Sequence, residues 1–250
     1  MSAPEKLSRP LAARVAHLPE PAEHRDNPEV SQAVIDAAIE ALRTGKTHYT
    51  DRPGILGLRE WVSKTLSETF GVELGADEVT ITCGATEARF VAIKQLVKPG
   101  KQLLCVGDAA AISSTASLIG VQIVNHVNEP DTIAAIYCTP NDDLNVLQPL
   151  LAQASQQHWW VIWDVSADTV GEHQRVLPSS PSSEARFHPA QNENLAPFVL
   201  TIGSLSNALP GWRVGWMAGS KMANKLRAYK QSMTICTTSI SQWAGLGLAK

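Results

Sequence analysis

Two serines and an arginine stand close together in the last third of the chain. Ser204 and Ser206 follow an apolar run, 198–202, that predicts a buried strand, and Arg213 directly precedes a second apolar run, 214–218. Glycine and proline between the two runs indicate turns, so the ends of both strands should meet at these side chains. Hydroxyls and a planar guanidinium donate hydrogen bonds to phosphate oxygens. The stretch therefore predicts a binding site for an anion.

A second anion-binding element is expected early in the chain. The strand predicted at 78–82 runs into a turn of small residues, Gly84-Ala85-Thr86, which begins a helix that ends near residue 98. The first N–H groups of a helix lack partners inside the helix, and the helix dipole favours negative charge there. Such turns are common in α/β proteins, so this one becomes specific only in combination with Arg213 and the serine turn.

An acidic side chain ends one of the most apolar runs of the sequence. Residues 159–163 predict a buried strand, and Asp164 follows directly. The simplest role for an acid at a strand end is to cap the turn that comes next. Two polar residues, Asn141 and Asp142, follow the strand predicted at 134–138 in the same way. Polar side chains thus come after several strands that the sequence predicts to be buried.

These residues must be positioned by a sheet with helices on both faces. Apolar runs alternate with helical patterns, which favours a three-layer α/β/α fold around a mostly parallel sheet of seven strands. The strands are expected at 78–82, 102–106, 121–125, 134–138, 159–163, 198–202 and 214–218. Helical spacing of apolar residues predicts helices at 28–43, 58–70, 84–98, 221–233 and from 239 onward.

Composition limits the classes of function that the chain can have. Its 250 residues, 44% of them hydrophobic, suffice for one sizeable core. We expect an N-terminal arm and helix over 1–45 and one large domain over 46–250. The net charge of −3, without a basic patch, argues against nucleic acid as a partner. No apolar run has membrane-spanning length and the N-terminus lacks a signal core, which favours a cytoplasmic protein without a membrane partner.

Cysteine and histidine spacing gives no sign of a metal site. The four cysteines lie far apart in the sequence, and three of them, Cys83, Cys105 and Cys138, fall in or beside predicted strands. No C-x-x-C pattern or histidine cluster is present, so we expect reduced thiols in the core and no bound metal.

Three stretches resemble the fold type I pyridoxal-phosphate enzymes of the class I/II aminotransferase family. They are the run T-I-G-S-L-S-N-A-L-P-G-W-R-V-G-W from Thr201, the turn G-A-T-E-A from Gly84, and the pattern H-Y-T-x-x-x-G-x-x-x-L-R-E from His48. The resemblance extends from about Asn27 to Lys250. It implies the large domain of such an enzyme and a homodimer with the site at the interface.

The resemblance implies that five residues hold the phosphate of the cofactor. In the family this phosphate lies against the G-A-x-E-A turn, the serine turn and the arginine. The positions in this chain that match are Ala85, Thr86, Ser204, Ser206 and Arg213.

Three further residues match family positions around the cofactor. Tyr49 matches a tyrosine that reaches the phosphate from the partner subunit, although a packed aromatic near a turn is an equal alternative. Asp164 matches the aspartate that pairs with the protonated pyridine nitrogen. Asn141 matches, displaced by one residue, the asparagine that bonds the ring hydroxyl, and Asp142 is the alternative for that position.

Several family features are missing from the chain. Asn207 stands where the family has the lysine that forms a Schiff base, and a carboxamide nitrogen cannot form an imine. The loop 107–112 carries alanines in place of an aromatic that stacks on the cofactor ring, and no tyrosine follows Asp164 closely. The small C-terminal domain, with its carboxylate-binding arginine, is expected to be absent.

These departures lead to a ranked set of hypotheses. The first is a non-catalytic pseudoenzyme, or a binding or scaffold subunit, with or without a retained phosphate or pyridoxal-phosphate subsite. It would act as a homodimer or as a heterodimer with an active paralogue. The second is an unusual enzyme of amino-group metabolism that holds pyridoxal or pyridoxamine phosphate without a covalent bond. A third is a gene fragment or an engineered lysine variant, although the other departures argue against an altered Asn207 alone.

Overall fold

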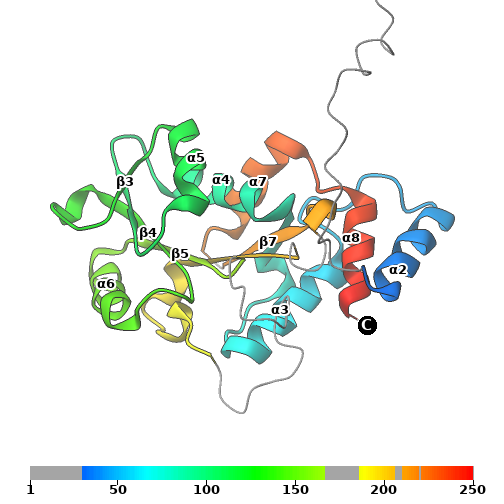
Figure 1. Ribbon diagram of the computed structural model, residues 1–250, viewed down its shortest axis with the longest axis horizontal. Coiled ribbons are helices and arrows are strands. Elements are labelled where there is room, and N and C mark those ends of the chain that lie inside the picture. Colours follow the sequence, from blue (N-terminus) through cyan, green and yellow to red (C-terminus); the bar gives the residue numbers. More distant parts are fainter. Residues whose placement is uncertain (1–29, 167–185, 206–209, 220, 250) are drawn as a thin grey trace, which may run out of the picture.

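A seven-stranded mixed sheet forms the centre of the molecule (Figure 1). The computed structural model describes residues 30–166, 186–205, 210–219 and 221–249. All seven predicted runs form strands, in the spatial order β1-β7-β6-β5-β4-β2-β3. Their bounds are β1 Val79–Thr82, β2 Gln102–Cys105, β3 Gln122–Val124, β4 Ile133–Cys138, β5 Trp160–Asp164, β6 Val199–Ser204 and β7 Gly215–Ala218. Only β7 runs antiparallel to its neighbours, β1 and β6.

Helices cover both faces of the sheet, so the predicted three-layer architecture is confirmed. In Figure 1, α4, α5 and α7 lie above the sheet, α3 and α6 lie below it, and α2 and α8 stand at one end. Their bounds are α2 Gln32–Arg43, α3 Leu56–Phe70, α4 Gly84–Leu96, α5 Ala110–Ile119, α6 Leu144–Gln157, α7 Ala223–Thr234 and α8 Ser239–Gly245. The helix expected from residue 28 begins at Gln32, and the expected arm over 1–29 lies outside the described residues.

Alternation along the strands divides the apolar side chains into two cores. On β5, Val161 and Trp163 join the core under α3 and α6, whereas Ile162 joins the core under α4, α5 and α7. Because successive side chains of a strand point to opposite faces, Asp164 follows Ile162 to the α4 face. Tyr137 on β4 belongs to the same core as Ile162, its partner in register. The period of the strand thus places a carboxylate and a phenol beneath α4.

A buried ion pair fixes the start of α4 to α7. Lys230 of α7 is fully buried and its Nζ lies 3.8 Å from Oε2 of Glu87 on α4. The Thr234 hydroxyl donates to the other Glu87 oxygen at 2.8 Å, and the Cys83 backbone N–H donates to Oε2 at 2.7 Å. Every oxygen of this buried carboxylate therefore has a partner, as a buried charge requires.

We expect Lys230→Met to lower the free energy of unfolding by about 3–5 kcal/mol, because Glu87 would remain buried without its cation. Urea titration followed by circular dichroism measures the change. The matched control is Lys230→Met combined with Glu87→Gln, which removes both charges and should recover much of the loss. Equal stability of the single variant and the wild type would contradict a structural role for the ion pair.

Candidate functional site

Arg213, Ser204, Asp164 and Asn141 lie at or beside strand ends along one edge of the sheet. Strands β1, β2, β4, β5 and β6 run in the same direction, so their carboxyl ends share this edge. Strand β7 runs the other way, which brings its beginning, and Arg213 just before it, to the same edge. Helix α4 begins directly after β1 and presents its N-terminus there. Crevices at the carboxyl ends of parallel strands are common ligand sites in α/β folds.

Close approach of α4 and β7 brings together the groups that we predict to bind an anion, called the anion site below. A Cβ atom on Gly215 would lie 2.5 Å from the carbonyl carbon of Gly84, so only glycine lets β7 come this near to the helix start. A Cβ atom on Gly84 would lie 2.8 Å from Nη2 of Arg213, which places this guanidinium against the first turn of α4. The predicted convergence of Arg213 with the Gly84-Ala85-Thr86 turn is confirmed.

The groups of this anion site have few partners of their own. Arg213 is exposed and makes no hydrogen bond or ion pair with any residue that the structure describes. The Cys83 side chain at the N-cap position of α4 makes no capping bond, although Glu87 accepts from the Cys83 N–H, and Thr86 is exposed in the first turn. Arg213 has φ +53, a sparsely populated region that costs an arginine on the order of 1–3 kcal/mol. Such strain is often found at ligand sites.

The serine turn is only partly described. Ser204 ends β6 on the α4 face, and its hydroxyl donates to the carbonyl of Val214 at 3.3 Å, which ties β6 to the beginning of β7. Ser206 and Asn207 lie outside the described residues, so their predicted roles stay predictions.

Asp164 has all its hydrogen-bonding capacity filled by the protein. Its side chain is 0% exposed. Oδ2 accepts from Arg89 Nε at 2.6 Å and from the Tyr137 hydroxyl at 2.8 Å. Oδ1 accepts from the Ser166 backbone N–H at 2.9 Å and from the Ser166 hydroxyl at 2.5 Å. A carboxylate offers about four lone-pair sites, so none is left for a further donor. The role of a turn cap, expected as the simplest one, is part of what Asp164 does.

The electrostatics agree with this geometry. Burial alone would lower the pKa of Arg89, but the Asp164 carboxylate more than offsets burial, and the pKa is raised. Burial, together with the negative charge of Asp164, raises the pKa of Tyr137 far above its ordinary value. At neutral pH Arg89 is therefore cationic, and Tyr137 is a neutral donor to Asp164.

Asn141, Asp142 and Tyr49 make no recorded contact with the cluster around Asp164. Asn141 is exposed in the turn after β4, where its N–H donates to the Thr139 hydroxyl at 3.3 Å. Asp142 accepts from the Thr139 N–H at 2.7 Å, and burial raises its pKa. Tyr49 is 79% exposed in the loop between α2 and α3. Its predicted role in a neighbouring subunit stays a prediction.

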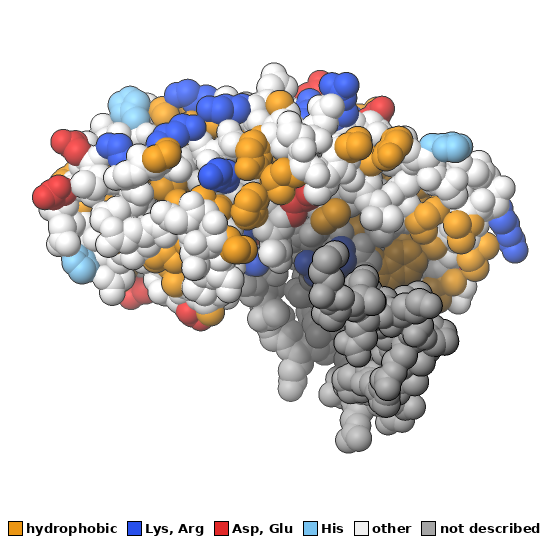
Figure 2. Space-filling model, turned by 90° about the horizontal axis from the view of Figure 1, so that it is seen from above, with side chains coloured by type: hydrophobic (Ala, Val, Ile, Leu, Met, Phe, Trp, Pro, Cys, Tyr) orange, Lys and Arg blue, Asp and Glu red, His pale blue; other side chains and the backbone are white. Residues whose placement is uncertain are grey.

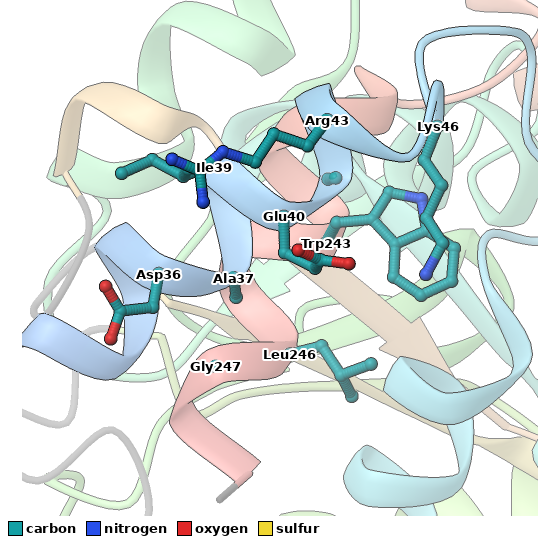
Figure 3. Close-up of a pocket in the computed structure, with 10 residues that line it drawn as sticks. Asp36, Ala37, Ile39, Glu40, Arg43, Lys46, Trp243, Leu246 and Gly247 are labelled. Carbon is teal, nitrogen blue, oxygen red and sulfur yellow. The ribbon is translucent and has the colours of Figure 1, made fainter.

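A separate hollow of about 500 Å³ lies between α2 and the C-terminal helices (Figure 3). Lys46 lies over the ring of Trp243, with its Nζ 3.8 Å from the ring centroid, and Asp36, Glu40 and Arg43 add further charges. The residues that line the hollow do not include Arg213, Thr86, Arg89 or Asp164, which mark the part of the sheet edge that we call the strand-edge crevice. Within the described ranges no group of acidic, histidine or cysteine side chains could hold a metal ion.

Sequence reasoning missed Arg89 and Tyr137, which contact Asp164. One available signal was the spacing of Arg89, four residues after Ala85, because residues four apart share one face of a helix. A charged residue on the face that packs on a sheet needs a buried partner. Tyr137 gave no signal, since a tyrosine in an apolar strand is ordinary.

The fold defines the class of the protein as an α/β chain with the architecture of an aminotransferase large domain. The aspartate aminotransferase from Thermus thermophilus with maleate superimposes with a TM-score of 0.72 at 22% identity, over 88% of this chain and 62% of that one. An aromatic aminotransferase from Pyrococcus horikoshii gives a TM-score of 0.72 at 19% identity, over 88% and 64%. At such identities the likeness concerns the fold.

Sequence comparison leads to the same class of relatives. The aspartate aminotransferase of Thermotoga maritima is 25% identical over 86% of this chain and 62% of its own length. The (5-formylfuran-3-yl)methyl phosphate transaminase of Methanocaldococcus jannaschii is 25% identical over 85% and 59%. No family model matches the chain. The chain is thus related to class I/II aminotransferases and spans about three fifths of the length of these two curated relatives.

We expect Asp164→Asn to lower the free energy of unfolding by about 3–5 kcal/mol, because Arg89 would lose its buried counter-ion. Tyr137→Phe removes one hydrogen bond to the carboxylate and should cost about 1.5–3 kcal/mol. Urea denaturation measures both, with the exposed Asp131→Asn as a control that should change little. An Asp164→Asn variant as stable as the wild type would show that this carboxylate has no structural role.

Proposed function

We propose that this chain is an aminotransferase-like protein that binds a phosphate group in the strand-edge crevice and does not catalyse transamination. The observation that supports phosphate binding is the position of Arg213 against the start of α4, exposed and without a partner in the described parts of the chain. The guanidinium and the first N–H groups of the helix would both donate to phosphate oxygens. Thr86 adds an exposed hydroxyl beside them.

The absence of catalysis is inferred from residue chemistry. Asn207 occupies the position that corresponds to the Schiff-base lysine, and a carboxamide cannot replace an amine in imine formation. The chain would then use the fold for binding or as a scaffold, because function resides in a site and not in the fold that carries it.

Aminotransferase relatives imply pyridoxal phosphate as a cofactor, and the crevice fits this molecule at one end only. The phosphate end fits, as described for Arg213 and α4. The ring end does not fit, because a protonated pyridine nitrogen would need a free oxygen of Asp164, and both oxygens are saturated. Ala109 and Ala110 also leave the ring without a stacking partner. We therefore derive no catalytic step through this cofactor.

The second candidate is an enzyme that holds pyridoxal or pyridoxamine phosphate without a covalent bond. Only the phosphate end of the crevice supports it. The saturated Asp164 is the reason for placing it second.

We also propose that the chain acts as a dimer, with itself or with an active paralogue. Three apolar residues of α2 are exposed, Ile35, Ile39 and Leu42, and Tyr49 is exposed in the loop that follows. Figure 2 shows hydrophobic side chains gathered at the end of the molecule where α2 lies. Exposed apolar surface of this kind is typical of subunit interfaces.

Phosphate binding should depend on Arg213. We expect Arg213→Asn to weaken binding of inorganic phosphate at least tenfold, since one or more charge-assisted hydrogen bonds of about 1.5–3 kcal/mol are lost. Asparagine is chosen because it tolerates a positive φ better than alanine. Isothermal titration calorimetry at low salt measures the affinity, with Arg43→Asn on α2 as the matched control. No heat with wild type at millimolar phosphate would refute the proposed binding.

A spectrum tests the proposed lack of transamination. Purified protein mixed with pyridoxal phosphate should show the absorbance of the free cofactor, and borohydride should leave no pyridoxyl group attached to residue 207 or any other side chain of the crevice. Intact-mass analysis and peptide mapping after reduction locate any attachment. A borohydride-trapped adduct in the crevice, with amino-group transfer from an amino acid to a keto acid, would overturn the proposal.

A further inference from the structure

Arg89 contacts Asp164 from α4, the helix that begins at the anion site. It lies four residues after Ala85 on the same face of α4, about 6 Å further along the helix axis from the anion site. Its side chain is only 13% exposed. Nε donates to Asp164 and Nη2 donates to the Ser166 hydroxyl at 2.7 Å. A guanidinium held by two charge-assisted bonds in a fixed plane has little freedom to move aside.

We propose that Arg89 is a specificity-determining residue: it occupies the cation-binding position on Asp164, so that the crevice accepts phosphate-bearing ligands without a positive charge and rejects phosphorylated cationic rings. The inference rests on the proposed phosphate binding at Arg213. It adds the chemical class of the ligand, which is inorganic phosphate or a phosphate monoester with a neutral body.

The charges of the cluster explain this selectivity. Arg89 and Asp164 neutralise one another, and no acceptor site remains on the carboxylate. A cationic ring would have to displace Arg89 from Asp164, which leaves the guanidinium poorly exposed to water and without its counter-ion. If Arg89 stayed, two positive charges would meet in a partly buried space. A ligand whose remaining part is neutral neither displaces Arg89 nor repels it. Its phosphate would still bind Arg213 and the start of α4.

The experiment compares two probes that share a phosphate and differ in the ring. Inorganic phosphate and pyridoxamine 5′-phosphate are titrated calorimetrically into the full chain; the pyridoxamine form is chosen because it makes no imine with lysines. In the wild type we expect pyridoxamine phosphate to bind at least tenfold more weakly than inorganic phosphate, because its cationic ring meets Arg89. In Arg89→Leu, which frees Asp164, we expect pyridoxamine phosphate to bind at least tenfold more tightly than phosphate. Arg89→Lys keeps the positive charge and should behave as the wild type.

Each outcome decides between the proposals. Wild-type protein that binds pyridoxamine phosphate as tightly as phosphate, or more tightly, overturns the role of Arg89, and so does an Arg89→Leu variant that gains nothing. Absence of phosphate binding in the wild type refutes the proposed function, and a gain for pyridoxamine phosphate in Arg89→Leu would still support the assignment of Arg89. If Arg89→Leu does not fold, Arg89→Gln retains a neutral donor, and the wild-type comparison decides on its own.

Discussion

A carboxylate at the end of a buried strand must be neutralised, and Asp164 meets this requirement through residues from three separate elements. Arg89 comes from α4, Tyr137 from β4 and Ser166 from the turn after β5. Leaving the charge unpaired in the interior would cost several kcal/mol, so these contacts hold α4 against the sheet. The position of the helix start, and with it the anion site, depends on this cluster.

Two further constraints act on the same helix. The pair Gly84 and Gly215 lets α4 and β7 touch through their backbones. Glu87, three residues after Gly84, forms the buried ion pair with Lys230 of α7. Helix α4 is thus fixed by a strand, by a neighbouring helix and by a buried carboxylate. A site whose donors belong to the backbone gains from such rigidity, since the donors need no reorganisation to meet an anion.

The two ends of the crevice differ in what they offer a ligand. At Arg213 the donors are open, whereas at Asp164 every acceptor is used within the chain. The curated relatives named above are transaminases, and this chain shares their fold over most of its own length. Sharing an architecture with an enzyme says little about the chemistry that a particular crevice supports. We propose that the chain binds an anion at Arg213 and that Arg89 takes the place of a ligand cation at Asp164.

The sequence by itself determined the seven strands, the layered fold and the relation to aminotransferases, because period-two and helical patterns of apolar residues are local signals. It also located Arg213 beside the turn at Gly84. Helices α5 and α6 were not anticipated. Much of the apolar content of α5 is alanine, and α6 contains Pro149, which a sequence pattern indicates as a helix break. Only the tertiary structure decided what Asp164 does, because its partners Arg89 and Tyr137 lie 75 and 27 residues away in the chain. Hydrogen bonds between such distant residues follow from strand register and helix rotation, which no local pattern specifies.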